Sequence, residues 1–170
     1  MYPEKITILI IEDNPGDVRL IKEVLAETNG GAFDLKYADR LSDGLKKISE
    51  NTVDIVLLDL SLPDSAGLET ITGFSEKNKD IPLIILTGTA ELDVAKRALG
   101  IGAQDYLVKG QFDSATLSRS IRYAIERKKI EAEIKENLSK LKRTFDQTIT
   151  TLGNIIEIKD PYTSGHQKKV

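Results

Sequence analysis

Along the first two-thirds of the chain, short apolar runs rich in β-branched residues alternate with longer amphipathic stretches. This alternation predicts strand–helix–strand units around a parallel sheet. The predicted strands cover residues 6–11, 33–37, 55–58, 83–86 and 106–108. Three of these runs are almost continuously apolar, which is typical of central parallel strands, whereas residues 34–37 alternate and therefore predict an edge strand.

The stretches between the strands carry helix signals. The first helix is expected over about 15–28, with Asn14 as its N-cap, Pro15 in its first turn and Gly30 and Gly31 at its end. Further helices are predicted over 42–50, 67–78, 91–100 and from about Ser114 onward. Five strands and five helices in about 125 residues predict an open, doubly wound α/β sheet, in which ligands bind beyond the carboxyl ends of the strands.

Acidic side chains follow two of the predicted central strands. Glu12 and Asp13 come directly after the first strand, and Asp59 directly follows the third. Taken singly, each could be a helix cap or a solvated turn residue. Neighbouring parallel strands bring their ends to one edge, however, so three carboxylates would crowd one cleft and repel each other. A Mg²⁺ ion would relieve this repulsion, because it prefers oxygen ligands and binds one or two carboxylates together with a phosphate oxygen.

Two further side chains are expected in the same cleft. Thr87 ends the fourth strand and Lys109 ends the fifth. The lysine could form a simple ion pair, but an ammonium group is also a good partner for a phosphoryl oxygen, and the threonine hydroxyl can donate to another oxygen of that group. Asp59 is thus a candidate nucleophile that would carry an aspartyl phosphate.

Four sequence blocks make the chain similar to the receiver domains of two-component response regulators. They are IIEDNPGD at 10–17, LLDLSLPDSAGL at 57–68, LIILTG at 83–88 and AQDYLVKG at 103–110. The resemblance covers about residues 5–125 and implies a flavodoxin-like (βα)5 fold. It also implies phosphorylation of Asp59 by a sensor histidine kinase, with Mg²⁺ at Glu12, Asp13, Asp59 and the backbone carbonyl of Ser61.

The same resemblance implies a conformational switch. Thr87 matches the switch hydroxyl, and Tyr106 matches the aromatic side chain whose exposure changes with it; an ordinary half-buried strand tyrosine is the alternative. One position departs from the family pattern, in which a proline joined by a cis bond usually follows the lysine. Here Gly110 follows Lys109, so a cis bond is not fixed and the loop is expected to be more mobile.

The last third of the chain predicts a long helix with a narrow apolar stripe. The stripe has alternating spacings of four and three, as in a coiled coil, and consists of Ile134, Leu138, Leu141, Phe145, Thr148, Leu152 and Ile155. Of the 18 residues from Glu126 to Arg143, 11 are charged, so little besides this stripe can be buried. We expect a parallel homodimer through residues 130–156; a helix packed back on the body, or a solvated helix, is the alternative.

The C-terminal residues resemble the opening of an HD-GYP-type cyclic di-GMP phosphodiesterase domain. The resemblance rests on IIEIKDPYTSGHQKKV at 155–170, in which His166 is the single histidine of the chain. The H-D and G-Y-P motifs of that family do not follow, so this stretch cannot build a His/Asp metal site, and it could be an incidental polar terminus. The expected organisation is a receiver domain over 1–125, a helical linker over 126–156 and the truncated start of an output domain over 157–170.

Composition narrows the functional classes. The 170-residue chain has no Cys, which excludes disulfide scaffolds and thiolate metal sites, and it has no apolar run near the roughly 20 residues that cross a bilayer. Residues 1–112 hold 12 Lys and Arg against 19 Asp and Glu, and residues 113–170 hold 12 against 8. An acidic body argues against nucleic acid as its partner, and a cytoplasmic protein without a membrane segment is expected.

Other functions remain open from the sequence. An aspartyl-phosphate hydrolase of the haloacid-dehalogenase type would place a second Asp two positions after the nucleophile, where this chain has Ser61. An adaptor that is never phosphorylated is a further alternative, although every expected acidic, hydroxyl and lysine position is filled. The chain itself is not expected to be an enzyme; a longer protein containing it could be a cyclic di-GMP phosphodiesterase.

Overall fold

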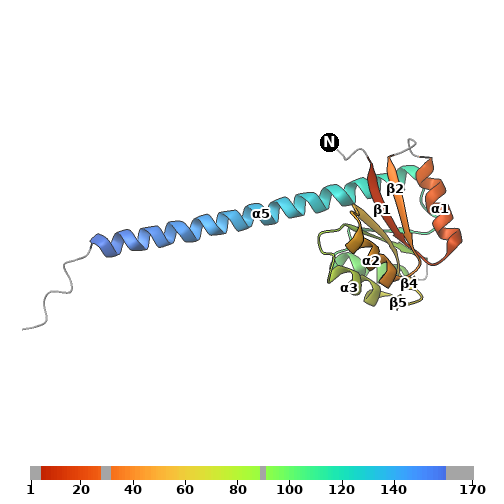
Figure 1. Ribbon diagram of the computed structural model, residues 1–170, viewed down its shortest axis with the longest axis horizontal. Helices are drawn as coiled ribbons and strands as arrows, with labels where there is room; N and C mark the ends of the chain where they lie inside the picture. Colours follow the sequence, from red (N-terminus) through yellow and green to blue (C-terminus); the bar gives the residue numbers. More distant parts are fainter. Residues whose placement is uncertain (1–4, 28–31, 89–90, 160–170) are drawn as a thin grey trace, which may run out of the picture. The chain divides into compact units, whose positions relative to one another are not determined.

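The computed structural model describes residues 5–27, 32–88 and 91–159 (Figure 1). Its strands are β1 (Ile6–Ile11), β2 (Phe33–Ala38), β3 (Ile55–Asp59), β4 (Ser61–Leu62), β5 (Ser65–Ala66), β6 (Leu83–Thr87) and β7 (Asp105–Val108). Its helices are α1 (Pro15–Ala26), α2 (Leu41–Glu50), α3 (Leu68–Ser75), α4 (Leu92–Ile101) and α5 (Ser114–Lys159). All five predicted strands and all five predicted helices are therefore present. The ends of these strands and of helices α1 to α4 lie within three residues of the predicted ends.

The main sheet has five parallel strands in the order β2-β1-β3-β6-β7. The expected edge strand, β2, lies at the edge, and the three continuous apolar runs form the centre. The strand order reverses direction at β1, which has β2 on one side and β3 on the other, so a crevice opens between the ends of β1 and β3. This arrangement is the open doubly wound sheet that the apolar pattern predicted, and it is the flavodoxin-like fold that the family resemblance implied.

Each face of the sheet is covered by its own hydrophobic core. One core packs α1 and α5 against the sheet through buried side chains such as Ile21, Leu117 and Ile121. The other packs α2, α3 and α4 against the opposite face through Leu41, Ile71 and Ala98. Burying each large aliphatic side chain contributes about 1.5–3 kcal/mol, so the two cores hold the strand ends in fixed positions.

Helix α1 begins as the sequence indicates. The side chain of Asn14 accepts a hydrogen bond from the Gly16 backbone N–H at 2.9 Å, and Pro15 occupies the first position of the helix. Asn14 directly follows Glu12 and Asp13, so this N-cap fixes the conformation of the turn that carries the two carboxylates.

The segment after β3 contains a feature that the sequence reading did not include. Strands β4 and β5 form a two-residue antiparallel hairpin, in which Ser61 pairs with Ala66 and Leu62 with Ser65. Helix α3 begins directly after it, one residue later than predicted, and ends at Ser75 instead of Asn78. Strands of two residues are too short to produce a recognisable alternation of polar and apolar positions.

Asp64, in the turn of this hairpin, caps helix α2. Its two carboxylate oxygens accept hydrogen bonds from the backbone N–H groups of Leu41 and Ser42, each at 2.9 Å. Arg40, the residue that precedes the helix, makes no such bond. Burial works against ionisation of Asp64, but the backbone hydrogen bonds outweigh it and lower the pKa of the carboxyl group.

Replacing Asp64 with Ala is expected to reduce the free energy of unfolding by about 1 kcal/mol, because the first turn of α2 loses its cap. Since the pKa is lower in the folded state, this contribution is present above the ordinary carboxyl value and is lost as the pH falls through the folded pKa. Chemical denaturation should show a difference in unfolding free energy between wild type and Asp64→Ala at pH 7 that narrows as the pH falls below the ordinary carboxyl pKa. Asp80→Ala, an exposed carboxylate before β6, is the control; an equal loss there would contradict the cap.

The last helix is continuous. α5 runs without a break from Ser114 to Lys159, through the positions at which the apolar spacing changes. Contacts divide the chain into two units, residues 1–129 and residues 130–170, so the first turns of α5 belong to the receiver-like body and the remainder forms its own unit. Within the described part of the chain, no helix is both long enough and apolar enough to span a membrane.

The apolar stripe of α5 is exposed. The side chains of Ile134, Leu138, Leu141 and Phe145 are each more than 60% exposed. The polar member of the stripe, Thr148, donates its hydroxyl to the backbone carbonyl of Thr144 at 2.9 Å. The HD-GYP-like residues from Asp160 onward lie outside the described residues.

Candidate phosphoacceptor site

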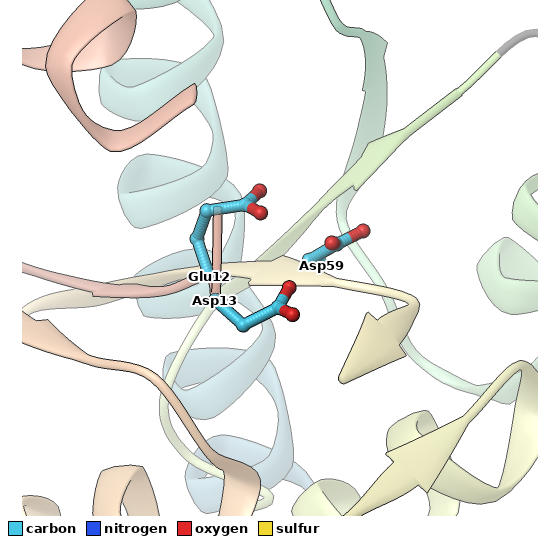
Figure 2. A group of neighbouring side chains, drawn as sticks. All are labelled: Glu12, Asp13 and Asp59. Carbon is cyan, nitrogen blue, oxygen red and sulfur yellow. The ribbon is translucent and has the colours of Figure 1, made fainter. Parts of the chain in front are cut away.

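Three carboxylates meet beyond the carboxyl ends of β1 and β3. Glu12 and Asp13 follow β1, Asp59 is the last residue of β3, and their nearest oxygens all lie within 4.8 Å of one another. Figure 2 shows the side chains of Glu12 and Asp13 extending from the end of β1 toward Asp59. Glu12 and Asp59 are buried and Asp13 is exposed, so the group is open to solvent on one side.

Lys109 supplies the positive charge of the site. Its ammonium nitrogen lies 2.9 Å from Asp59 Oδ2, 2.6 Å from Glu12 Oε2 and 3.0 Å from Asp17 Oδ2. Lys109 follows β7, and its backbone N–H donates to the carbonyl of Thr87 at 2.9 Å, which fixes the start of its loop. Burial disfavours the charged lysine, but its bonds to Glu12, Asp59 and Asp17 outweigh burial and raise its pKa above the usual range.

Glu12 is the most constrained of the acids. Its Oε1 accepts a hydrogen bond from the Asn14 backbone N–H at 3.1 Å. Its Oε2 is buried and lies 2.6 Å from the Lys109 ammonium. Burial, together with the neighbouring charge of Asp59, raises the pKa of Glu12 to about 7 despite the opposing effect of Lys109.

The arrangement fits a hard divalent cation. Three neighbouring carboxylates, two of them buried, offer the all-oxygen ligand set that Mg²⁺ prefers. A cation there would also favour the ionised form of Glu12, which burial disfavours. Glu12, Asp13 and Asp59 are therefore the residues that could hold the metal.

Thr87 and Tyr106 lie on the neighbouring strands. Thr87 ends β6, one residue beyond the pair formed by Leu86 and Asp59, and is fully buried. Its hydroxyl donates to the carbonyl of Gly88 at 3.0 Å and is thus directed to its own loop. Tyr106 pairs with Ile85 across β6 and β7 and packs, partly buried, against the core that carries α2, α3 and α4.

The loops around the carboxylates are tied together by side-chain contacts that could not be read from the sequence. Ser61 donates its hydroxyl to Glu91, which immediately precedes α4. Asp17, in the first turn of α1, contacts Lys109. Asp17 is visible in the sequence as the last residue of the block at 10–17, but there it reads as an acidic residue favoured by a helix N-terminus.

The bond that joins Lys109 to Gly110 is trans, since the described residues contain no cis peptide bond. Gly110 adopts a φ of 74°, in the left-handed region that glycine occupies without steric cost. A proline, whose φ is fixed near −65°, could not occupy this loop conformation. The departure from the family pattern therefore corresponds to a different turn after Lys109.

A family model described as the response regulator receiver domain matches residues 8–122, which include every residue of the site. The chain belongs to this family. A solved receiver domain from Clostridium thermocellum is 30% identical, superposes with a TM-score of 0.64 and covers 74% of this chain and 98% of its own. This receiver domain thus has both the sequence and the fold of two-component response regulators.

Curated relatives place similar receiver domains in larger proteins. The transcriptional regulatory protein MalR of Bacillus subtilis is 37% identical over 61% of this chain and 44% of its own length. A probable cyclic di-GMP phosphodiesterase of Vibrio cholerae is 25% identical over 94% of this chain and 38% of its own length. The chain therefore spans less than half of each of these two relatives.

Proposed function

We propose that this receiver domain accepts a phosphoryl group on Asp59 from a sensor histidine kinase, with Mg²⁺ as its cofactor. The observation that carries the proposal is the position of Asp59. Asp59 is 3% exposed, and its carboxylate lies 2.9 Å from the Lys109 ammonium. The carboxylates of Glu12 and Asp13 lie within 4.8 Å of it. An acceptor for phosphate needs this combination of a nucleophilic oxygen and nearby positive charge.

In the proposed reaction, a carboxylate oxygen of Asp59 attacks the phosphorus of a phosphohistidine. A P–O bond forms, the P–N bond breaks, and the leaving imidazole keeps the electron pair of that bond. Lys109 donates to the negative oxygens of the transferring group and so stabilises charge that the cleft would otherwise repel. Mg²⁺, held by Glu12, Asp13, Asp59 and the backbone carbonyl of Ser61, would supply further charge neutralisation.

Thr87 and Tyr106 would convert this chemistry into a structural change. The Thr87 hydroxyl donates to Gly88 in the present structure, so it has to leave that carbonyl before it can donate to a phosphoryl oxygen. Its movement would open space on the strand beside Tyr106, whose ring would then become more buried. Phosphorylation would favour that second state only by the difference in affinity between the two.

We further propose that α5 is a dimeric linker and that it leads to an output domain. The exposed apolar stripe would pair with a second copy through residues 130–156, as a parallel coiled coil. The similarity to the probable phosphodiesterase of Vibrio cholerae over 94% of this chain supports an output domain of the HD-GYP type. The cytoplasm, where histidine kinases present their phosphohistidines, is the expected location.

The function is tested by incubating the chain with acetyl phosphate and Mg²⁺ and measuring its intact mass. We expect one added phosphoryl group in the wild type, none after Asp59→Asn, and none when a chelator removes the metal. Asp34→Asn, an acid on the edge strand β2 with a half-exposed side chain, is the matched control and should be modified like the wild type. A wild type that is never modified, or an Asp59→Asn variant that still is, would overturn the proposal.

A further inference from the structure

Lys109 has three carboxylate partners, and they differ in what they can do during phosphoryl transfer. The lysine ammonium has three hydrogens, and the three oxygens lie at 2.6, 2.9 and 3.0 Å, from Glu12, Asp59 and Asp17 in that order. Under the proposed function, Glu12 would turn to the metal and Asp59 would bond to phosphorus. Asp17 is then the carboxylate that still pairs with Lys109.

The position of Asp17 is set independently of the reacting groups. It lies in the first turn of α1, where the helix dipole favours a negative charge, and the Asn14 cap fixes that turn. α1 is anchored in the core by Val18, Ile21 and Leu25. The backbone that carries Asp17 is therefore anchored by groups that bind neither the metal nor the phosphoryl group.

We propose that Asp17 is a positioning residue that keeps the Lys109 ammonium directed into the cleft after Asp59 is phosphorylated. With the lysine held by Asp17 from one side, its remaining hydrogens point toward the phosphoryl oxygens. The next residue in the loop, Gly110, has no side chain that could support Lys109 from that side. This inference rests on the proposed function, and it adds a residue that acts through the lysine.

The experiment measures the affinity of beryllofluoride, a phosphoryl mimic, by ¹⁹F NMR at saturating Mg²⁺. We expect Asp17→Ala to weaken binding about fivefold and Asp17→Glu to recover part of that loss, since a charged pair that is partly exposed contributes about 1 kcal/mol. Glu23→Gln is the control, because Glu23 lies on the same helix and its carboxylate pairs with Arg19. This variant should bind beryllofluoride like the wild type.

A double-mutant cycle separates positioning from a general effect of charge or folding. If Asp17 acts through Lys109, Asp17→Ala has no further effect in a Lys109→Met background. Asp17→Ala that binds like the wild type, or that weakens binding equally in both backgrounds, would overturn the inference. A wild type that does not bind beryllofluoride would instead overturn the proposed function, so the two failures are distinguishable.

Discussion

Replacing Lys109 with Met is expected to lower the free energy of unfolding of the metal-free protein by about 3 kcal/mol. The substitution keeps most of the aliphatic stem and removes the charge that Glu12, Asp59 and Asp17 share. Glu12 is fully buried and Asp59 nearly so, which leaves their repulsion without a counter-charge. The lysine side chain is 20% exposed, so solvent relieves part of the cost and places the loss at the low end for a buried pair.

Denaturant unfolding with and without Mg²⁺ tests this expectation. Since a divalent cation can replace the missing positive charge, Mg²⁺ should stabilise Lys109→Met more than it stabilises the wild type. Lys96→Met removes an exposed lysine that lies 4.0 Å from Asp93, and it should change stability by less than about 0.5 kcal/mol. If Lys109→Met and the wild type unfold at the same denaturant concentration, Lys109 does not balance the acidic cluster.

Placing charges on the stripe of α5 is expected to abolish the proposed dimer. Leu138→Glu with Leu141→Glu puts four charges into the centre of a two-stranded coiled coil, where each leucine would contribute about 1.5–3 kcal/mol. Both side chains are 66% exposed in the single chain, so the substitutions remove little from its own folding. The dissociation constant should rise more than about 100-fold.

Sedimentation at tens of micromolar should therefore give a dimer for the wild type and a monomer for the double variant. Ser139→Glu with Gln147→Glu adds the same number of charges to the same helix outside the stripe, and it should remain dimeric. A monomeric wild type, or a double variant that remains a dimer, would show that the stripe has another role.

The sequence was sufficient for the sheet because apolar runs and their connections determine a parallel arrangement. The continuous runs that became β1, β3 and β6 are central, and the alternating run that became β2 is at the edge. Once those strands are parallel and adjacent, the carboxylates that follow them must meet. The grouping of Glu12, Asp13 and Asp59 therefore follows from the sequence alone.

The contacts that could not be predicted from the sequence are those that join residues from different loops. Asp17 and Lys109 are 92 positions apart, and their contact depends on how the first turn of α1 faces the end of β7. The direction of the Thr87 hydroxyl depends on the conformation of its own loop, and neither is encoded in spacing. The hairpin of β4 and β5 escaped prediction because two-residue strands have no periodicity.

The cap on helix α2 has a consequence for the order in which the chain assembles. The carboxylate that binds Leu41 and Ser42 belongs to Asp64, 23 and 22 residues further along the chain. During synthesis, α2 therefore emerges before the group that completes its first turn, and its N-terminal hydrogen bonds can form only after β3 has joined the sheet. Helix α2 thus acquires its full stability late, together with the loop that follows Asp59.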